Sequence, residues 1–466
     1  MNALPFTRWA TRIQHESQRP AYLLIADMIA EGIGSGEFPA HYRLPPLREL
    51  AAILGLNYTT VTRGYAEARR RGLIDSRPGL GSFIRSKAST LPKVTSSYEM
   101  TMNAPVEPDM RFLEEEMRNG VINLFNRSSI TDLMRYQDFG GTAEDKAVAM
   151  HWIGQKCKVN NPSEILVCPG IHVALVGLLT LTKRKNSALC VSNLVYPGIK
   201  AIASQLNIKL KVVSCDKDGP IPSSLEALCK LGLISSFYIN PTLHNPTTLT
   251  IPLKRRTELA EICLRYDIAV IEDDAYAALM KDYIPAFAEI IPGLTWYITG
   301  LSKCLGPGLR IGFVKCPDKQ SAHLLSGILR TLTVMSSPFT NALACQWITD
   351  GTAERMLAAV RTEAKQRQKL AALHLAGLDY SADENGYHIW LPIPEIISTN
   401  SSDVAAKLRE QGISVVSGVA FCTDNSPPNN IRLSLGGAQT RQQCEENLKT
   451  LGGLLSNPYH FSSIAI

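Results

Sequence analysis

A lysine and an arginine lie close together in the stretch TGLSKCLGPGLRIGF, residues 299–313. Lys303 follows a strand-like run, and the Gly-Pro-Gly turn after it presents Arg310, so the spacing places an amine near a guanidinium. A lysine that is desolvated in such a pocket can form a Schiff base, while an arginine can clamp a phosphate. The stretch therefore predicts a covalent cofactor site, although Lys303 taken alone is more typical of a surface lysine.

Acidic residues follow an apolar strand-like run in AVIEDDAYAAL, residues 269–279. A carboxylate at the end of that strand could pair with a protonated ring nitrogen and make the ring an electron sink. The alternative interpretation is that Glu272, Asp273 and Asp274 only cap a helix.

Two further motifs could contact a phosphorylated ligand. In INPTLHNPTTLTIP, two Asn-Pro-Thr-like turns follow a strand and hold Asn245 at its C-terminal end, where ligand sites of parallel α/β sheets gather. A plain proline turn is the alternative. In VCPGIHVALVGLL, Gly170 opens an apolar helix whose free N–H groups suit a phosphate.

The elements that position these motifs alternate along the chain. From about residue 108 onward, apolar β-like runs alternate with helical patterns. The runs are ALCVSN, KLKVVSC, SSFYIN, IAVIEDD, LTWYITG and RIGFVKC. This alternation predicts an α/β fold with a mainly parallel sheet covered by helices on both faces.

The first part of the chain has a different pattern. Three helical patterns cover residues 19–34, 45–54 and 57–72; the second begins with prolines and ends at Gly55, and Asn57 is the expected N-cap of the third. The segments LIDS, RPGLG and SFIRS then predict a small hairpin. Together these elements indicate a helix-turn-helix followed by a wing.

Length and composition fit at least two domains, because 466 residues exceed the roughly 250–300 at which a single core stops growing. No run of about 18 apolar residues and no charged leader before an apolar core is present, so we expect a cytoplasmic protein. The 11 cysteines form no Cys-x-x-Cys pair, which favours reduced thiols and no metal site.

Positive charge is concentrated at the start of the chain. Residues 1–87 hold twelve Lys and Arg against seven Asp and Glu, an excess of five in a chain whose net charge is +6. Such a local field suits a polyanionic partner. The alternative is a three-helix protein-interaction module with a solvated basic face.

Residues 20–85 resemble the winged helix-turn-helix of the GntR family in the order of their elements. The resemblance implies that double-stranded DNA is the partner and that Arg43 and Arg48 lie near its phosphates. The residues implied in major-groove and wing contacts are Asn57, Tyr58, Thr59, Thr60, Arg63, Arg77, Gly79 and Gly81. This sequence departs from the family at Pro46, where a serine is usual, and at Asn57-Tyr58, where Ser-Arg is usual.

Residues 108–455 resemble the fold-type I aminotransferases, which bind pyridoxal 5′-phosphate (PLP). The resemblance implies that Lys303 is the catalytic lysine that holds PLP as an internal aldimine, and that Asp273 pairs with the pyridinium nitrogen. It also implies that Asn245 and Tyr276 hydrogen-bond the ring hydroxyl oxygen and that Tyr196 stacks on the ring.

The same resemblance implies which residues contact the phosphate of PLP and which residue anchors the carboxylate of an effector. The implied phosphate contacts are Gly170, Ile171, His172, Ser302 and Arg310, together with Tyr136 reaching the neighbouring subunit. Arg432, in NNIRLSLGG, is implied as the anchor of an amino-acid carboxylate. Departures from the family are Gly300 in place of a hydroxyl residue, Thr248 in place of glycine and His244 in place of glutamine.

The combination of the two units resembles the MocR subfamily of bacterial transcription regulators. It implies a winged helix-turn-helix domain at 1–87, a linker at 88–107, and a PLP-binding effector and dimerisation domain at 108–466. The implied function is a homodimeric DNA-binding regulator that senses PLP or an amino compound that reacts with it. Two alternatives stay open: a genuine aminotransferase with a DNA-binding extension, and a regulator whose large domain only dimerises.

Overall fold

The structure is a computed structural model that describes residues 4–15, 19–35, 37–39, 42–77, 81–84, 101, 103–108, 111–397, 399–424, 426–437 and 439–456. The chain forms two compact units, Met1–Ser96 and Ser97–Ile466. The predicted linker of 88–107 differs from this division, because residues 103–107 belong to the large unit and Val106 is part of its core.

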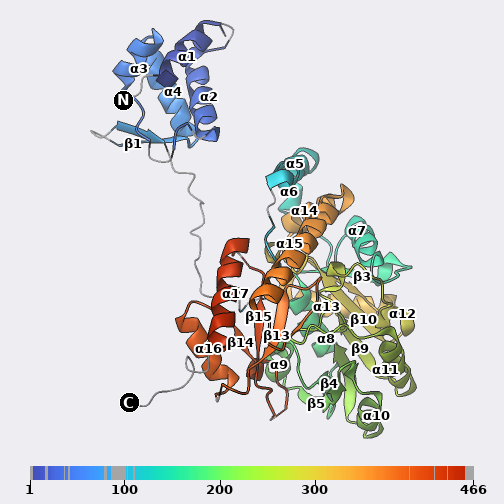
Figure 1. Cartoon of the computed structure of the whole chain (residues 1–466). Coiled ribbons are helices and arrows are strands. Elements are labelled where there is room, and N and C mark those ends of the chain that lie inside the picture. Colours follow the sequence, from blue (N-terminus) through green and yellow to red (C-terminus); the bar gives the residue numbers. More distant parts are fainter. Residues whose placement is uncertain are drawn as a thin grey trace. The chain divides into compact units, whose positions relative to one another are not determined.

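The described residues of the N-terminal unit form four helices and a hairpin (Figure 1). They are α1 (Leu4–His15), α2 (Ala21–Gly34), α3 (Leu47–Leu54), α4 (Tyr58–Arg70), β1 (Ile74–Arg77) and β2 (Gly81–Ile84). Gly55 ends α3 in the left-handed conformation, φ 65°, as the glycine in the predicted turn allows. Asn57 precedes α4 as expected, but its side chain makes no capping hydrogen bond.

Helix α1 was not among the predicted elements. Its Phe6 and Trp9 are buried and both contact the ring of Phe38, with Phe6 stacked at a centroid distance of 5.6 Å and Trp9 edge-on at 5.9 Å. Ala10 and Ile13 also pack against the same core, so the apolar spacing of residues 6, 9, 10 and 13 is the signal that predicts this helix.

The large unit is built on a seven-stranded sheet in the order β3-β11-β10-β9-β8-β4-β5. Its strands are β3 (Ile165–Cys168), β4 (Ala188–Ser192), β5 (Lys209–Val213), β8 (Ile234–Ile239), β9 (Ala269–Asp273), β10 (Thr295–Gly300) and β11 (Gly312–Lys315). Only β11 runs antiparallel to its neighbours, so the predicted, mainly parallel sheet is confirmed.

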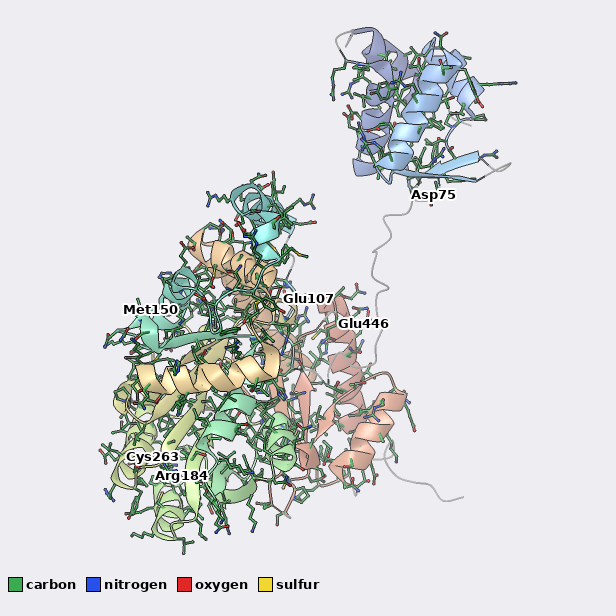
Figure 2. All side chains as sticks on the ribbon, turned by 180° about the vertical axis from the view of Figure 1, so that it is seen from behind. Asp75, Glu107, Met150, Arg184, Cys263 and Glu446 are labelled. Atoms are coloured by element: carbon green, nitrogen blue, oxygen red, sulfur yellow. The ribbon has the colours of Figure 1, made fainter. Side chains whose placement is uncertain are left out.

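Helices cover both faces of this sheet. The helices that accompany it are α7 (Ala143–Gly154), α8 (Ile171–Thr182), α9 (Pro197–Gln205), α10 (Pro222–Lys230), α11 (Leu253–Arg265), α12 (Phe287–Ile290) and α13 (Lys319–Thr333). Ile271 packs on one face with residues of α8, α9 and α13, whereas its neighbour Val270 packs on the other face with α10, α11 and α12. This alternation along β9 is the period of two expected for a strand buried on both sides. Side chains fill the space between the layers (Figure 2).

A second, antiparallel sheet in the order β12-β13-β15-β14 follows in the chain. Its strands are β12 (Ser381–Ala382), β13 (His388–Pro392), β14 (Val416–Ser417) and β15 (Asn430–Ser434). The remaining helices of the large unit are α5 (Arg111–Arg127), α6 (Ile130–Leu133), α14 (Pro338–Thr349), α15 (Thr352–His374), α16 (Ser401–Glu410) and α17 (Arg441–Leu455), and a short hairpin joins β6 (Cys215–Asp216) to β7 (Gly219–Pro220). Among the described helices, none is long and apolar enough to cross a membrane.

Candidate functional site

Three neighbouring parallel strands bring the site together. Strands β8, β9 and β10 lie side by side and run in the same direction, so their C-terminal ends meet at one edge of the sheet. Asn245 follows β8, Asp273 ends β9, and Lys303 follows β10. These are the residues that the sequence motifs single out, and the topology places them at the edge of the sheet where ligand sites of parallel α/β folds gather.

Asp273 is a buried carboxylate whose two oxygens have different surroundings. Oδ2 accepts a 2.8 Å hydrogen bond from the Tyr238 hydroxyl, whereas Oδ1 has no hydrogen-bond partner within the described residues. Burial raises the pKa of Asp273 to about 6, and the charge of Asp274 acts in the same direction. A buried acceptor without a partner is costly, so Oδ1 is suited to a donor from a bound ligand.

The neighbouring acids have other partners. Glu272 accepts backbone N–H bonds from Phe287 and Ala288 at 2.9 and 3.0 Å, so it caps the start of α12. The Asp274 carboxylate accepts from the Tyr297 hydroxyl at 3.3 Å. Glu272 therefore caps a helix, whereas the pairing of Asp273 with a ring nitrogen stays a prediction.

Lys303 is half-buried, and its amine bonds a backbone carbonyl. Its Nζ donates a 2.5 Å hydrogen bond to the carbonyl oxygen of Asn103 and lies 5.9 Å from the centre of the Tyr276 ring. Burial lowers the pKa of Lys303 to about 8, and the positive charges of Arg432 and Arg310 add to this effect. A lysine amine with a lowered pKa is more often neutral near pH 7 and is a better nucleophile.

A phosphate-sized anion is suited to the start of α8. Gly170 precedes the helix with φ 94°, and a Cβ atom there would lie 3.1 Å from Nη2 of Arg310. The guanidinium therefore lies against the free N–H groups of the helix N-terminus. Burial lowers the pKa of His172, and the positive charge of Arg310 adds to this effect.

Gly300 is required by close packing. A Cβ atom at this position would lie 2.9 Å from the carbonyl oxygen of Ile311 and 3.2 Å from Cγ1 of Ile171. Thr299 does not replace the missing hydroxyl, because its own hydroxyl is buried and donates to the carbonyl of Asp274 at 3.3 Å. The side chain of Ile171, the first residue of α8, thus packs against the glycine.

Two of the three predicted ring contacts, Tyr196 and Tyr276, are also near Asp273. Tyr196 is half-buried at the start of α9, and burial followed by the charge of Asp273 raises its pKa. The Tyr276 hydroxyl accepts a 2.7 Å hydrogen bond from Nδ2 of Asn103. Burial raises the pKa of Tyr276, so the phenol stays protonated.

Arg432 is a buried guanidinium on β15. Its Nη1 donates to Oδ1 of Asn245 at 3.3 Å, its Nη2 donates to the carbonyl of Thr101, and Nε has no partner within the described chain. Burial lowers the pKa of Arg432 to about 10. Within the described residues, Arg432 forms no ion pair with an Asp or Glu side chain. Its guanidinium is therefore suited to the carboxylate of a ligand.

The remaining large-unit predictions fall outside this group or at its margin. Tyr136 is 82% exposed. Ser302 is half-buried beside Lys303, and no hydrogen bond of its side chain is recorded among the described contacts. His244, which stands where glutamine is usual, is half-buried with Nδ1 2.8 Å from the Thr247 hydroxyl, and desolvation lowers its pKa to about 4.

Sequence reasoning missed three residues of the site. Tyr238 and Asn240 both bond Asp273, the latter through Nδ2 and the Asp273 carbonyl oxygen at 2.7 Å. Asn240 stands in the first of the two Asn-Pro turns, so the motif itself carried a signal. Asn103 lay in the predicted linker, where nothing in the sequence indicated a contact with the sheet.

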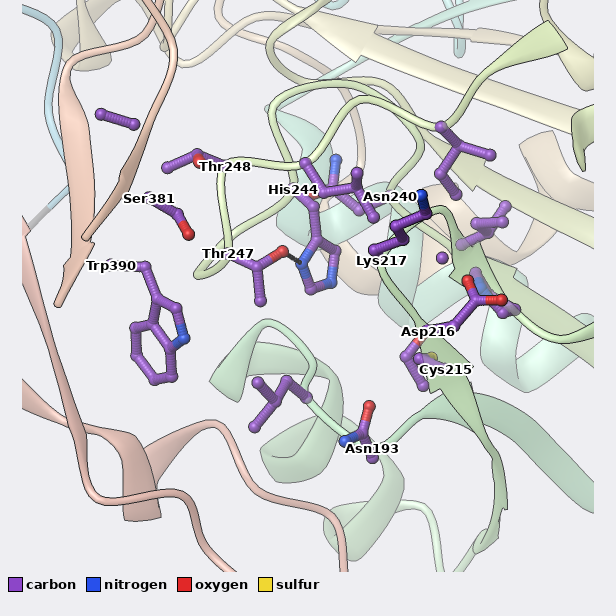
Figure 3. A pocket seen from close by; sticks show the side chains of 18 residues that line it. Asn193, Cys215, Asp216, Lys217, Asn240, His244, Thr247, Thr248, Ser381 and Trp390 are labelled. Atoms are coloured by element: carbon purple, nitrogen blue, oxygen red, sulfur yellow. Dashed lines mark hydrogen bonds between the residues drawn. The ribbon is translucent and has the colours of Figure 1, made fainter. Parts of the chain in front are cut away.

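A cavity of about 490 Å³ lies beside these residues (Figure 3). It shares Asn240 with the group but is lined by neither Lys303 nor Asp273. Asp216 on its wall is paired with Arg255 at 2.8 Å. The described residues hold no cluster of His, Cys, Asp and Glu that could bind a metal ion.

In the N-terminal unit, the predicted DNA contacts are mostly solvent-exposed. Exposed side chains are Arg43, Arg48, Asn57, Tyr58, Thr59 and Arg63, while Thr60 is half-buried. Arg43 pairs with Phe83 across a β-bridge and lies beside Gly81, and the guanidinium of Arg63 lies 4.3 Å from the Tyr22 ring centre. Gly79 and the side chain of Arg77 lie outside the described residues.

The large-unit group fits PLP in three respects. Lys303 offers an amine for the aldehyde, the free oxygen of Asp273 offers an acceptor for a protonated ring nitrogen, and Gly170 with Arg310 offers a phosphate cradle. Each requirement of the cofactor is thus met by a different element of the same sheet edge.

Comparison with known proteins agrees with both units. Residues 21–84 match the family model of bacterial regulatory proteins of the gntR family, and residues 108–451 match that of aminotransferases of class I and II. The chain is 28% identical over 448 residues to the uncharacterized HTH-type transcriptional regulator YdeF of Bacillus subtilis, covering 95% of this chain and 96% of YdeF. It is also 28% identical over 417 residues to the vitamin B6 salvage pathway transcriptional repressor PtsJ of Salmonella typhimurium, covering 88% and 93% of the two chains.

Solved structures support the fold. The α-aminoadipate aminotransferase LysN of Thermus thermophilus superposes with a TM-score of 0.70 at 20% identity, covering 85% of this chain and 100% of LysN. An archaeal alanine:glyoxylate aminotransferase gives 0.69 at 21% identity, covering 77% and 90%. The predicted pairing of a winged helix-turn-helix with an aminotransferase-like unit is confirmed.

Proposed function

The chain belongs to the aminotransferase class I and II family and carries a gntR-family domain, the arrangement of the MocR regulators, and we propose that it is a DNA-binding transcription regulator controlled by PLP. Its N-terminal unit binds double-stranded DNA, and its large unit binds PLP and responds to it or to an amino compound. The curated relatives that it matches over nearly its full length bear the names of transcription regulators, which supports the regulatory role.

The observation that carries the cofactor assignment is the free Oδ1 of buried Asp273 near the amine of Lys303. PLP supplies an electron sink for the chemistry of amines when it is bound. Asp273 would hold the ring nitrogen, Gly170 and Arg310 would hold the phosphate, and Lys303 presents an amine whose lowered pKa makes the neutral form more accessible than in an ordinary lysine. Arg432 orients an amino compound through its carboxylate.

Regulation requires that the ligand bind two conformations of the protein with different affinities. The contact between Arg432 on β15 and Asn245 after β8 joins the small sheet to the large one at the site. A ligand carboxylate at Arg432 competes for the same donors, so it alters the contact between the two sheets. We expect this change to alter the DNA affinity of the winged helices.

The decisive test is the visible absorbance of the purified protein mixed with PLP, before and after Lys303→Ala. The wild-type protein is expected to show the band of the lysine-bound cofactor and the variant to lose it, because the substitution removes the amine that would form the Schiff base. Lys156→Ala is the matched control, since Lys156 is also partly buried and, among the described residues, bonds the carbonyls of Lys281 and Asp282. An unchanged band in Lys303→Ala would refute the assignment.

A second candidate function, a working aminotransferase, is favoured by the retention of half-buried Lys303 together with the buried Asp273 and Arg432. A 2-aminoadipate transaminase of Thermus thermophilus is 26% identical over 341 residues, covering 69% of this chain. Incubation with amino and keto acids separates the two functions, because turnover of roughly 1 s⁻¹ or more would favour the enzyme.

A further inference from the structure

Residues 101 and 103–107, which we call the strap, lie across the carboxylate and lysine end of the candidate site. We propose that the strap is a built-in competitor: its first residues occupy the place of an amino-acid ligand, and a ligand carboxylate displaces them. This inference rests on the proposed function, since it assigns the event by which that site is regulated.

Asn103 makes the central contacts of the strap. It is 5% exposed, its carbonyl oxygen accepts from Nζ of Lys303 at 2.5 Å, and its Nδ2 donates to the Tyr276 hydroxyl at 2.7 Å. The Ser434 hydroxyl lies 3.4 Å from its Oδ1. The backbone and the side chain of one residue thus bond two groups that the proposed function assigns to the cofactor.

Thr101 contacts the arginine of the candidate site, whereas Asn103 contacts the lysine. The Thr101 carbonyl accepts from Nη2 of Arg432, the guanidinium assigned to the ligand carboxylate. A carbonyl is a neutral acceptor, whereas a carboxylate can take two charge-assisted hydrogen bonds from one guanidinium. Because Nε of Arg432 has no partner within the described chain, a carboxylate would gain a donor that Thr101 leaves unused.

The C-terminal half of the strap is anchored firmly. The Gly437 N–H donates to the carbonyl of Pro105 at 3.1 Å, and Val106 is buried and forms a parallel bridge with Gly437. A Cβ atom on Gly436 would lie 1.8 Å from the carbonyl oxygen of Ala104. The strap therefore approaches the backbone at Gly436 more closely than a residue with a side chain at this position would allow. Displacement is therefore expected at Thr101 and Asn103, with Pro105 and Val106 staying in place.

The strap lies directly after the division between the two compact units at Ser96 and Ser97. Release of Thr101 and Asn103 would add these residues to the chain that joins the DNA-binding unit to its anchor at Val106. A ligand that binds the released state more tightly would shift the population toward it. The contact with Arg432 thus links ligand binding to the connection between the units.

Hydrogen–deuterium exchange of the full-length protein tests the displacement with two probes. N-(5′-phosphopyridoxyl)-L-leucine carries the ring, the phosphate and a carboxylate, whereas pyridoxamine 5′-phosphate lacks the carboxylate. We expect the first compound to increase exchange in the peptide covering 101–108, and the second to leave it within about twofold of the free protein. Unchanged or slower exchange with the leucine compound would overturn the inference.

Asn103→Ala tests the competition by affinity. The variant loses the side-chain bonds to Tyr276 and Ser434, so it should bind the leucine compound about 5–10-fold more tightly and pyridoxamine 5′-phosphate within about twofold of wild type. Asn341→Ala is the control, because Asn341 is 7% exposed and lies on α14. Weaker binding of the leucine compound to Asn103→Ala would instead mean that Asn103 contacts the ligand.

The two compounds also separate this inference from the proposed function. If the wild-type protein binds both compounds but the strap does not respond, only the competitor role is wrong. If it binds neither compound, the cofactor assignment is wrong and the inference is wrong with it.

Discussion

Asp273 shows how a single buried residue can be unfavourable for stability and useful for binding. Its pKa rises from 3.8 to about 6 mainly because the carboxylate loses water, and only Tyr238 among the described side chains donates to it. A protonated ring nitrogen would supply the missing donor. If Asp273 pairs with the ring nitrogen as proposed, the free energy lost by burying the charge would be recovered in the bound state.

This cost predicts the pH dependence of Asp273→Asn in the cofactor-free protein. The folded state binds the Asp273 proton more tightly than the unfolded chain, so its contribution to the unfolding free energy falls as pH rises through the folded pKa. Near pH 8 the ionised carboxylate lowers the free energy of unfolding by roughly 3 kcal/mol. Below about pH 4 the carboxyl group is protonated in both states and does not lower it. Asp273→Asn should therefore gain stability relative to wild type as the pH is raised from about 5 to 8, measured by thermal melting followed by circular dichroism.

Asp318→Asn is the control for this experiment. Asp318 caps α13 and its pKa is lowered by the Ser321 N–H, so its effect should stay constant from about pH 5 to 8. The same Asp273→Asn variant should bind PLP about 10–100-fold more weakly, because a neutral amide cannot make the charge-assisted bond. A parallel pH profile for Asp273→Asn and wild type would contradict the account.

Gly300 gives a prediction that separates packing from cofactor binding. Restoring a hydroxyl with Gly300→Ser would push a Cβ against the Ile311 carbonyl, which is backbone and cannot turn aside. We expect a loss of roughly 1–3 kcal/mol in stability and weaker PLP binding, measured by melting temperature and absorbance titration. Gly293→Ser is the matched control, because a Cβ at Gly293 meets nothing within 4 Å. Tighter PLP binding at unchanged melting temperature would show that the site lacks only the hydroxyl.

At the scale of elements, the strands and the motifs at their ends could be predicted, whereas the short and distant elements could not. The strands β8, β9 and β10 are buried apolar runs of five or six residues, and polar residues at their C-terminal ends mark the site. In the small sheet, β12 and β14 have two residues each, too few for a visible period. The strap escaped prediction because its contacts are with residues more than 170 positions away.

The helices and wing of the N-terminal unit predict how DNA affinity responds to Arg48→Ala. Arg48 is exposed on α3, and removing one phosphate contact should weaken binding to a duplex of arbitrary sequence and reduce the salt dependence of log K by about one unit. Fluorescence anisotropy at several salt concentrations measures both. Arg184→Ala, on the exposed surface of the large unit (Figure 2), should leave the slope unchanged. Equal slopes for wild type and Arg48→Ala would remove Arg48 from the DNA-binding face.

At the scale of the whole molecule, the highly exposed Tyr136 is the residue that a monomer does not explain. The resemblance to fold-type I aminotransferases implies that it reaches the phosphate of the neighbouring subunit, and its 82% exposure leaves the hydroxyl available for such a contact. Phe125, Ile130 and Met134 on or beside α5 and α6 are exposed as well, which gives this part of the unit an apolar surface. We therefore expect a homodimer in which each site takes Tyr136 from the other subunit.

Mixed dimers of two defective variants test this arrangement. Lys303→Ala removes the lysine of its own site, and Tyr136→Phe removes the hydroxyl from the site of its partner. If Tyr136 crosses between subunits, one site of the mixed dimer carries both defects and the other carries neither. Co-expressed and purified mixed dimers should then hold PLP at half of their sites with wild-type affinity, measured by absorbance titration, although neither parent does so. If Tyr136 acted within its own subunit, no site of the mixed dimer would be intact, and the wild-type affinity would not return.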